Sequence, residues 1–184
     1  MAKTPSAMLP LGTCAPQFSL LDVVSESTVS LNSRHNSCAT VIMFICNHCP
    51  YVRHVNNELI RLANDYKNNN VCFLAINSND VEKYPDDSPE NMKKTALHLA
   101  YPFPYLFDET QEVARAYQAA CTPDFFVFDK QMALAYRGQL DDSRPGSNLA
   151  PDGSSIRNAL DCLIAGEPVP SNQKPSIGCN IKWK

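Results

Sequence analysis

Two cysteines, Cys46 and Cys49, are separated by two residues at a point where the character of the sequence changes. Residues 39–45 form an apolar run rich in β-branched side chains, which predicts a buried strand. Over residues 50–69, apolar side chains recur at spacings of three and four, which predicts an amphipathic helix that begins with Pro50. The N–H groups and the dipole of a helix N-terminus stabilise a thiolate. The junction therefore predicts a reactive dithiol that exchanges with disulfides.

The rest of the chain alternates between strand and helix patterns. Residues 71–77 form a second apolar run, and a strand, a helix and a strand in this order predict a right-handed parallel crossover. Two short alternating segments within residues 8–38 predict an N-terminal β-hairpin that leads into the main sheet. Further strands are expected at 105–107, 125–128 and 134–138, and further helices near 89–99, 111–119 and 155–165.

The length of the chain indicates one domain. A chain of 184 residues can bury a core without the help of disulfides. We expect a single α/β domain over residues 1–184, with a mixed central sheet and a core at about 10–166. The tail, residues 167–184, carries three prolines and is expected to be irregular.

Charge and hydropathy exclude several classes of partner. A net charge of −3 with scattered lysines and arginines predicts no nucleic-acid partner. The first residues lack the apolar core of a signal peptide, and no later run is as long as a membrane span. A cytoplasmic protein without membrane contact is therefore expected. Three of the eight cysteines, Cys38, Cys72 and Cys162, are expected to be small buried side chains.

Four motifs make the chain similar to a known family. They are Cys-Asn-His-Cys-Pro-Tyr-Val at 46–52, Asn-Asp-X-X-X-Tyr-Pro-X-Asp-Ser-Pro-Glu at 79–90, Cys-Thr-Pro-Asp-Phe-Phe at 121–126 and Gly-Cys-Asn-Ile-Lys-Trp at 178–183. With the order of elements, they resemble small thioredoxin-like proteins of the alkyl hydroperoxide reductase/thiol-specific antioxidant (redoxin) group. The resemblance implies a thioredoxin fold, in which helices flank a mixed central sheet, with an N-terminal β-hairpin extension and an inserted helix.

The same resemblance implies roles for particular residues. Cys46 corresponds to the cysteine that attacks a substrate, and Cys49 to the one that resolves the mixed disulfide. Pro123 corresponds to a proline that this fold holds in cis beside the dithiol, and Thr122 with Pro123 would offer backbone to an extended substrate. No cofactor is implied, and the expected partners are protein or small-molecule disulfides and thiols. The expected function is that of a thiol–disulfide oxidoreductase.

The residues between the two cysteines depart from thioredoxin, which has Gly-Pro there. A histidine next to the second cysteine stabilises a thiolate, and hence the reduced form. We therefore expect Asn47 and His48 to tune the dithiol, with a reduction potential above the ~−270 mV of thioredoxin. The alternative is that His48 is a turn residue facing solvent without a role. Thioredoxin's buried acid is replaced here by Thr40, which cannot shuttle a proton.

Two other functions are open. The first is a thiol-dependent peroxidase with an antioxidant role. Peroxiredoxins carry Pro-X-X-X-Thr-X-X-Cys, but counting back from Cys46 or Cys49 supplies neither the proline nor the threonine, and nothing local places Arg137 as the guanidinium. Efficient peroxide reduction is therefore not expected. The second is a redox-sensing or docking module, which slow turnover with every disulfide donor would favour.

A metal site is the competing interpretation of the cysteine pair. Zinc takes four ligands, usually from two such pairs or from a pair and spaced histidines. The histidines outside the motif, His35, His54 and His98, do not have that spacing. No metal is expected.

Two further thiols are candidates for redox roles. Cys121 directly precedes the Thr-Pro dipeptide, where it is either a mixed-disulfide partner or a half-buried bystander. Cys179 becomes a third redox cysteine if the tail folds back across the helix N-terminus. Alternatively, Ile181 and Trp183 simply anchor the terminus by burial.

Overall fold

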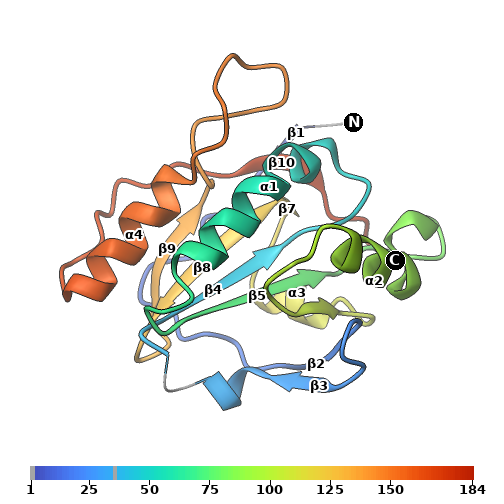
Figure 1. Ribbon diagram of the computed structural model, residues 1–184, viewed down its shortest axis with the longest axis horizontal. Coiled ribbons are helices and arrows are strands. Elements are labelled where there is room, and N and C mark those ends of the chain that lie inside the picture. The colour runs from blue at the N-terminus through green and yellow to red at the C-terminus, as the bar shows by residue number, and fades with distance from the viewer. Residues whose placement is uncertain (1–2, 35–36) are drawn as a thin grey trace.

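The computed structural model describes residues 3–34 and 37–184, and a seven-stranded mixed sheet lies at its centre (Figure 1). β4, β5 and β6 run parallel to one another, whereas β2 is antiparallel to β6, and β8 is antiparallel to both β4 and β9. The predicted N-terminal hairpin, β2–β3, joins the sheet through β6. In spatial order, the strands are β3 (Thr28–Ser30), β2 (Ser19–Asp22), β6 (Tyr105–Phe107), β5 (Val71–Asn77), β4 (Ala39–Phe44), β8 (Asp124–Asp129) and β9 (Leu134–Gly138).

The crossover β4–α1–β5 carries the two cysteines, with α1 spanning Pro50–Asp65. All six residues of β4 are buried, because the strand lies in the middle of the sheet and both of its faces are covered. α1 packs on the sheet through the apolar stripe Val52, Val55, Leu59 and Leu62. This packing holds the first turn of α1 at the carboxyl end of β4.

Helices cover the sheet on both sides (Figure 1). α1, α2 (Pro89–His98) and α4 (Ser154–Ala165) bury their apolar side chains in one core cluster. On the opposite face, α3 (Glu112–Ala116) and the N-terminal segment enclose a second cluster, in which Tyr117 packs against Phe44 and Phe126. Within the described residues, no helix is both long enough and apolar enough to cross a membrane.

Three helices end where the backbone leaves helical geometry. α1 stops at Asp65, four residues before the predicted end at 69, because residues 66–70 form turns. α3 is shorter than its predicted span, since Gln118 adopts a left-handed conformation with φ 51°. α4 ends at Gly166, whose φ of 74° is accessible because glycine has no Cβ.

A second sheet corrects the prediction for the tail. β10 (Ile177–Asn180) lies between β1 (Lys3–Pro5) and β7 (Cys121–Thr122), antiparallel to both. The expectation of an irregular tail is therefore wrong over Ile177–Asn180. The local pattern could not show this strand, because both of its partners are distant in the sequence. Gly178 permits the pairing, since a Cβ at this position would lie 2.0 Å from the carbonyl oxygen of Thr122.

The isolated cysteines are less buried than predicted. Cys38, Cys72 and Cys162 are half-buried, not enclosed in the core. Cys38 lies near the end of α4, where its thiol approaches the Leu163 carbonyl at 3.9 Å.

Candidate active site

The cysteine pair lies between the end of β4 and the start of α1. Cys49 is the N-cap residue of α1, and Pro50 occupies its first turn. Both thiols are almost enclosed, since Cys46 is 2% exposed and Cys49 is 0% exposed. Each of the eight cysteines, all within the described residues, is a reduced thiol. The predicted position of the pair at a helix N-terminus is found, whereas its redox role stays a prediction.

The segment that follows β7 lies against both cysteines. The hydroxyl oxygen of Thr122 lies 3.3 Å from Cys46 Sγ, and its carbonyl oxygen accepts from Cys49 Sγ at 3.1 Å. The Thr122–Pro123 peptide bond is cis, as the resemblance implied. Thr122 also pairs with Cys179 in the second sheet. The backbone expected to receive a substrate is thus already paired with the chain's own C-terminal strand.

Strand β10 brings a third thiol to the pair. Cys179 is 1% exposed, and its Sγ lies 2.9 Å from Cys49 Sγ. The tail therefore does fold back to the helix N-terminus, which was the condition for a redox role of Cys179. Cys121 instead directs its thiol to the Pro123 carbonyl at 3.6 Å, and burial raises its pKa. The Cys121 thiol thus contacts backbone, whereas the Cys179 thiol contacts a cysteine.

The pKa values of the two motif cysteines shift in opposite directions. Hydrogen bonds from the Cys46 and Cys179 thiols and from the Val52 N–H oppose burial and lower the pKa of Cys49 to about 5. The hydrogen bond to Cys49, together with burial and the charge of Asp87, raises the pKa of Cys46. The Thr122 carbonyl opposes ionisation of Cys49, because it can only accept a hydrogen bond. The pair as a whole thus loses its first proton well below the ordinary range of a thiol.

His48 is held by an acid that the sequence analysis missed. Its Nδ1 lies 2.6 Å from Oδ2 of Asp87, a fully buried residue at the end of the 3₁₀ helix Pro85–Asp87. The hydrogen bond to Asp87, against burial, raises the pKa of His48. Burial would raise the pKa of Asp87, but hydrogen bonds from His48 and Asn79 hold it below its usual range. An imidazolium–carboxylate pair therefore stands beside the dithiol.

The second ring nitrogen of His48 is buried beside Tyr84. His48 Nε2 is enclosed and has no hydrogen-bond partner among the described residues. The ring stacks on Tyr84, with centroids 5.4 Å apart and planes at 13°. The interpretation of His48 as a turn residue that faces solvent is therefore wrong, because the side chain is only 14% exposed and is paired.

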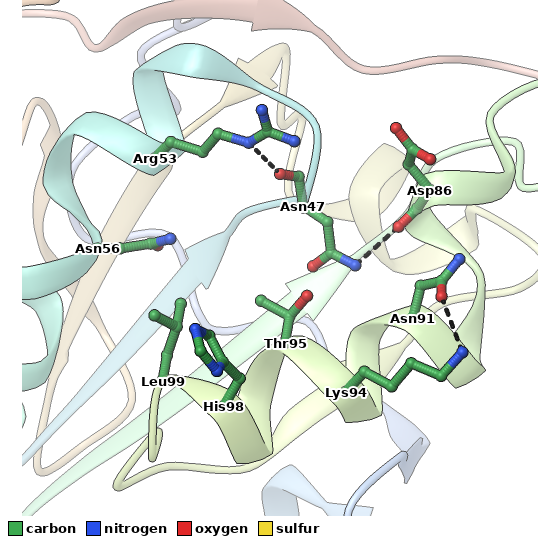
Figure 2. Close-up of a pocket in the computed structure, with 9 residues that line it drawn as sticks. All are labelled: Asn47, Arg53, Asn56, Asp86, Asn91, Lys94, Thr95, His98 and Leu99. Carbon is green, nitrogen blue, oxygen red and sulfur yellow. Dashed lines mark hydrogen bonds between the residues drawn. The ribbon is translucent and has the colours of Figure 1, made fainter.

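Asn47 links the motif to a polar hollow of about 570 Å³ between α1 and α2. The side-chain amide of Asn47 donates to the Asp86 backbone carbonyl at 2.8 Å, and the backbone carbonyl of Asn47 accepts from Arg53 Nε at 2.9 Å (Figure 2). Its side-chain oxygen accepts from the Tyr105 hydroxyl at 3.2 Å. Arg53 of α1 and Lys94 of α2 both line this hollow, so each of the two helices contributes a cationic group to it.

Three potential metal ligands meet at the site. The ligand atoms of Cys46, His48 and Asp87 all lie within 4.8 Å of one another, a grouping that sequence spacing could not show. They are one short of the four ligands of a structural zinc site, and the imidazole and carboxylate are bonded to each other. His54 binds Ser143, while His35 lies outside the described residues.

Thr40, which replaces the buried acid of thioredoxin, and Arg137, considered as a peroxide-binding guanidinium, both bond to residues outside the cysteine motif. Thr40 is buried and directs its hydroxyl to Met132 Sδ at 4.0 Å. The Arg137 guanidinium donates to the Leu9 carbonyl and to Gln173. Asp124, directly after Pro123, is a buried acid that the sequence analysis overlooked. Burial raises its pKa to about 7.

Comparison with known proteins identifies the relatives of this architecture. Residues 11–137 match the AhpC/TSA family. An uncharacterized conserved protein from Geobacillus kaustophilus is 62% identical with a TM-score of 0.98, and the match covers 100% of this chain and 97% of that chain. A hypothetical protein from Sinorhizobium meliloti is 41% identical with a TM-score of 0.96, and 98% of each chain is covered. No curated protein matches the chain.

More distant structures establish the fold. A putative thiol:disulfide interchange protein DsbE from Chlorobium tepidum is 18% identical with a TM-score of 0.69, over 85% of this chain and 99% of that chain. The fold is therefore thioredoxin-like, with a mixed sheet flanked by helices, and that prediction is confirmed.

Proposed function

The chain belongs to the AhpC/TSA family, and on that premise we propose that it is a thiol–disulfide oxidoreductase whose Cys46 and Cys49 cycle between dithiol and disulfide. The observation that carries the proposal is the position of Cys49 at the N-terminus of α1, with its pKa lowered to about 5. A thiol with a pKa of about 5 is present mainly as the thiolate near neutral pH, and the thiolate is the nucleophile in disulfide exchange. Family and fold support a redox function in general terms.

Cys46 is the thiol that first bonds the substrate. It precedes the helix, whereas Cys49 is the N-cap residue of α1. When a proton passes from Cys46 to the Cys49 thiolate, Cys46 becomes the thiolate and attacks one sulfur of the substrate disulfide. The other substrate sulfur leaves with the bonding electron pair, and a mixed disulfide on Cys46 remains.

Cys49 completes the exchange. Its thiolate, favoured by the Val52 N–H, attacks the Cys46 sulfur of the mixed disulfide. The second substrate sulfur leaves as a thiolate, so the substrate gains two electrons and the pair becomes a disulfide. Run in reverse, the same steps oxidise a dithiol substrate.

Substrates reach the site over Asn47 and His48, which are the half-buried residues of the motif. β10 occupies the Thr122 backbone, so an extended peptide cannot pair there without displacing this strand. The proposed partners are therefore small-molecule disulfides and disulfides on exposed protein loops. No cofactor takes part in the exchange.

Hydroxyethyl disulfide turnover in the presence of dithiothreitol tests the proposal. Cys46→Ser is expected to abolish turnover, and Cys49→Ser to accumulate a mixed disulfide on Cys46. Cys162→Ser, a half-buried cysteine on α4, serves as the control. Turnover of Cys46→Ser at the wild-type rate would rule the proposal out. Rapid mixed-disulfide formation without turnover of any donor would support a redox-sensing or docking module instead.

A thiol peroxidase is the second candidate, and one contact favours it. The threonine missing from the local motif is replaced in space by Thr122, whose hydroxyl lies 3.3 Å from Cys46 Sγ. In this reaction the Cys46 thiolate takes one oxygen of a peroxide, and the other oxygen leaves as an alcohol or water when the O–O bond breaks. The Cys49 thiol then condenses with the sulfenic acid, which forms the disulfide and releases water. Peroxide consumption by the reduced protein, compared with that by Thr122→Val, decides between the two candidates.

A further inference from the structure

We propose that Cys179 is a third redox residue, which takes the disulfide from the active pair as a Cys49–Cys179 bond and returns Cys46 to the thiol state. This inference rests on the proposed function, because it requires a Cys46–Cys49 disulfide to form first. Cys49 is the shared member of both bonds. Its sulfur contacts the Cys46 thiol through a hydrogen bond and lies 2.9 Å from Cys179 Sγ.

The sulfur separation is close to bonding distance. A disulfide has an S–S length of about 2.05 Å, so the two sulfurs need to approach by less than about 1 Å. Neither residue has to leave the interior, since Cys49 is 0% exposed and Cys179 is 1% exposed. The exchange can therefore take place without an opening of the fold.

The position of Cys179 is built by pairing on both sides of its strand. Cys179 is in register with Thr122 of β7 on one side and with Lys3 of β1 on the other. Gly178 lets β10 approach so closely that even a methyl group would overlap the Thr122 carbonyl oxygen. β10 is thus held against Thr122, which also contacts both motif cysteines.

The segment after β10 is anchored as well. Ile181 is buried, and its N–H donates to the Ala120 carbonyl at 3.2 Å. The N–H of Lys182 donates to Asn79 Oδ1, and its carbonyl accepts from Asp80 N–H at 2.8 Å. These contacts fix the chain on the C-terminal side of Cys179. Simple burial of the terminus, the alternative considered for this segment, does not by itself place one sulfur against another.

The proposed step is a thiol–disulfide exchange inside the protein. Burial and the hydrogen bond to Cys49 raise the pKa of Cys179, so its thiol gives up its proton only as the exchange proceeds. The Cys179 sulfur attacks the Cys49 sulfur of the Cys46–Cys49 disulfide, so the Cys49–Cys179 bond forms and the Cys46–Cys49 bond breaks. The electron pair of the broken bond goes to Cys46, and the proton lost by Cys179 is recovered there. No external oxidant or reductant is needed, because the number of disulfides does not change.

The consequence is a protected oxidised form. A Cys49–Cys179 disulfide would be enclosed on all sides, and only Cys46 could attack it from within. Cys46 would meanwhile be available for a mixed disulfide with a second substrate. The chain would then hold two oxidising equivalents while Cys46 remains a thiol.

Peptide mapping of the disulfides tests the relay. The Cys46→Ser protein, treated with diamide and alkylated at low pH, is expected to lose two of its seven remaining thiols in a Cys49–Cys179 bond. Cys46→Ser combined with Cys179→Ser is expected to lose none, whereas Cys46→Ser with Cys162→Ser should form the bond as readily as Cys46→Ser alone. In wild-type protein quenched at intervals, Cys46–Cys49 should appear first, and Cys49–Cys179 should follow at a rate independent of protein concentration.

The outcomes separate the relay from the proposed function. If wild-type protein forms Cys46–Cys49 but Cys46→Ser forms no bond to Cys179, the relay is overturned and the oxidoreductase stands. A Cys49–Cys121 bond in its place overturns the relay as well. If wild-type protein forms no Cys46–Cys49 bond, both proposals fail. Far-ultraviolet circular dichroism of each variant establishes that it is folded.

Discussion

The imidazole of His48 and the carboxylate of Asp87 form a closed pair beside the dithiol, with Nδ1 and Oδ2 2.6 Å apart. Oδ1 of the same carboxylate accepts from the backbone N–H groups of Asn47 and His48 at 2.8 and 3.3 Å. One buried acid thus holds both the imidazole and the backbone between the cysteines. Because it also cancels part of the imidazolium charge, His48 acts on the thiolate less strongly than an isolated cation would.

Asp87→Asn is expected to lower the pKa of His48, because the hydrogen bond to the carboxylate is the main cause of its elevation. It should also destabilise the fold by about 2–4 kcal/mol, since buried donors lose a charged acceptor. Titration of the His48 ring protons by NMR measures the first effect, and urea unfolding the second. An unchanged His48 titration in Asp87→Asn would refute this account of the pair.

The same pair predicts a pH dependence of stability. The folded pKa of His48 lies above its unfolded value, so its contribution is complete below about pH 6.5 and is lost as the pH rises through the folded value. The pKa of Asp87 is lowered, so its contribution is lost only as the pH falls through that value. The difference in unfolding free energy between wild type and His48→Gln should shrink from about pH 6 to about pH 9. A difference that stays constant over this range contradicts the prediction.

His48→Ala should make the disulfide less oxidising. Removal of the imidazole leaves Asp87 buried beside the thiols without its partner, so the reduced, thiolate-bearing form loses stability. We expect wild-type protein to have a potential above ~−270 mV and the variant to lie lower by on the order of 30 mV. Equilibration with glutathione buffers measures both values. A wild-type potential at or below that of thioredoxin, or a higher potential in His48→Ala, would be the opposite result.

Gly178→Ala tests how β10 is held. The added Cβ would lie 2.0 Å from the Thr122 carbonyl oxygen, so the strand must move away from β7. We expect a loss of about 1–3 kcal/mol in unfolding free energy. The distance from Cys49 to Cys179 should also increase, with slower formation of their disulfide. Asn180→Ala, an exposed position in the same strand, is the control. Equal stability of the two variants would show that the close approach is not required.

Asp124→Asn should stabilise the protein at alkaline pH. Burial raises the pKa of Asp124 to about 7, so its neutral form is favoured in the fold, and stability is lost as the pH rises through that value. The variant should gain on the order of 3 kcal/mol over wild type at about pH 8 and little at about pH 4. Urea unfolding at both values provides the comparison. A variant less stable than wild type at the higher pH would show that the charged carboxylate is needed.

Local sequence patterns predict the elements at the centre of the fold. The apolar runs at β4 and β5 and the helical spacing of α1 are visible in the sequence, because buried strands and amphipathic helices have distinct periods. The position of the dithiol follows from these three elements alone. The motif resemblance added the cis Thr122–Pro123 bond, which no periodicity could indicate.

Long-range partners account for what the sequence analysis missed. Asp87 lies 39 residues from His48, and in sequence it is simply one acid in a polar loop. β10 follows a segment that holds three prolines, and its partners lie at the opposite end of the chain and after α3. Contacts of this kind depend on how the sheet brings distant segments together.

Disulfide mapping of the Cys179→Ser protein tests the central claim most directly, because the relay cannot move the bond in that variant. After reaction with one equivalent of hydroxyethyl disulfide and alkylation at low pH, Cys46 and Cys49 should be found joined, with the other thiols alkylated. If both remain alkylated while the disulfide reagent is consumed elsewhere, or if Cys46 and Cys49 never pair under any oxidant, the chain is not an oxidoreductase of the kind proposed.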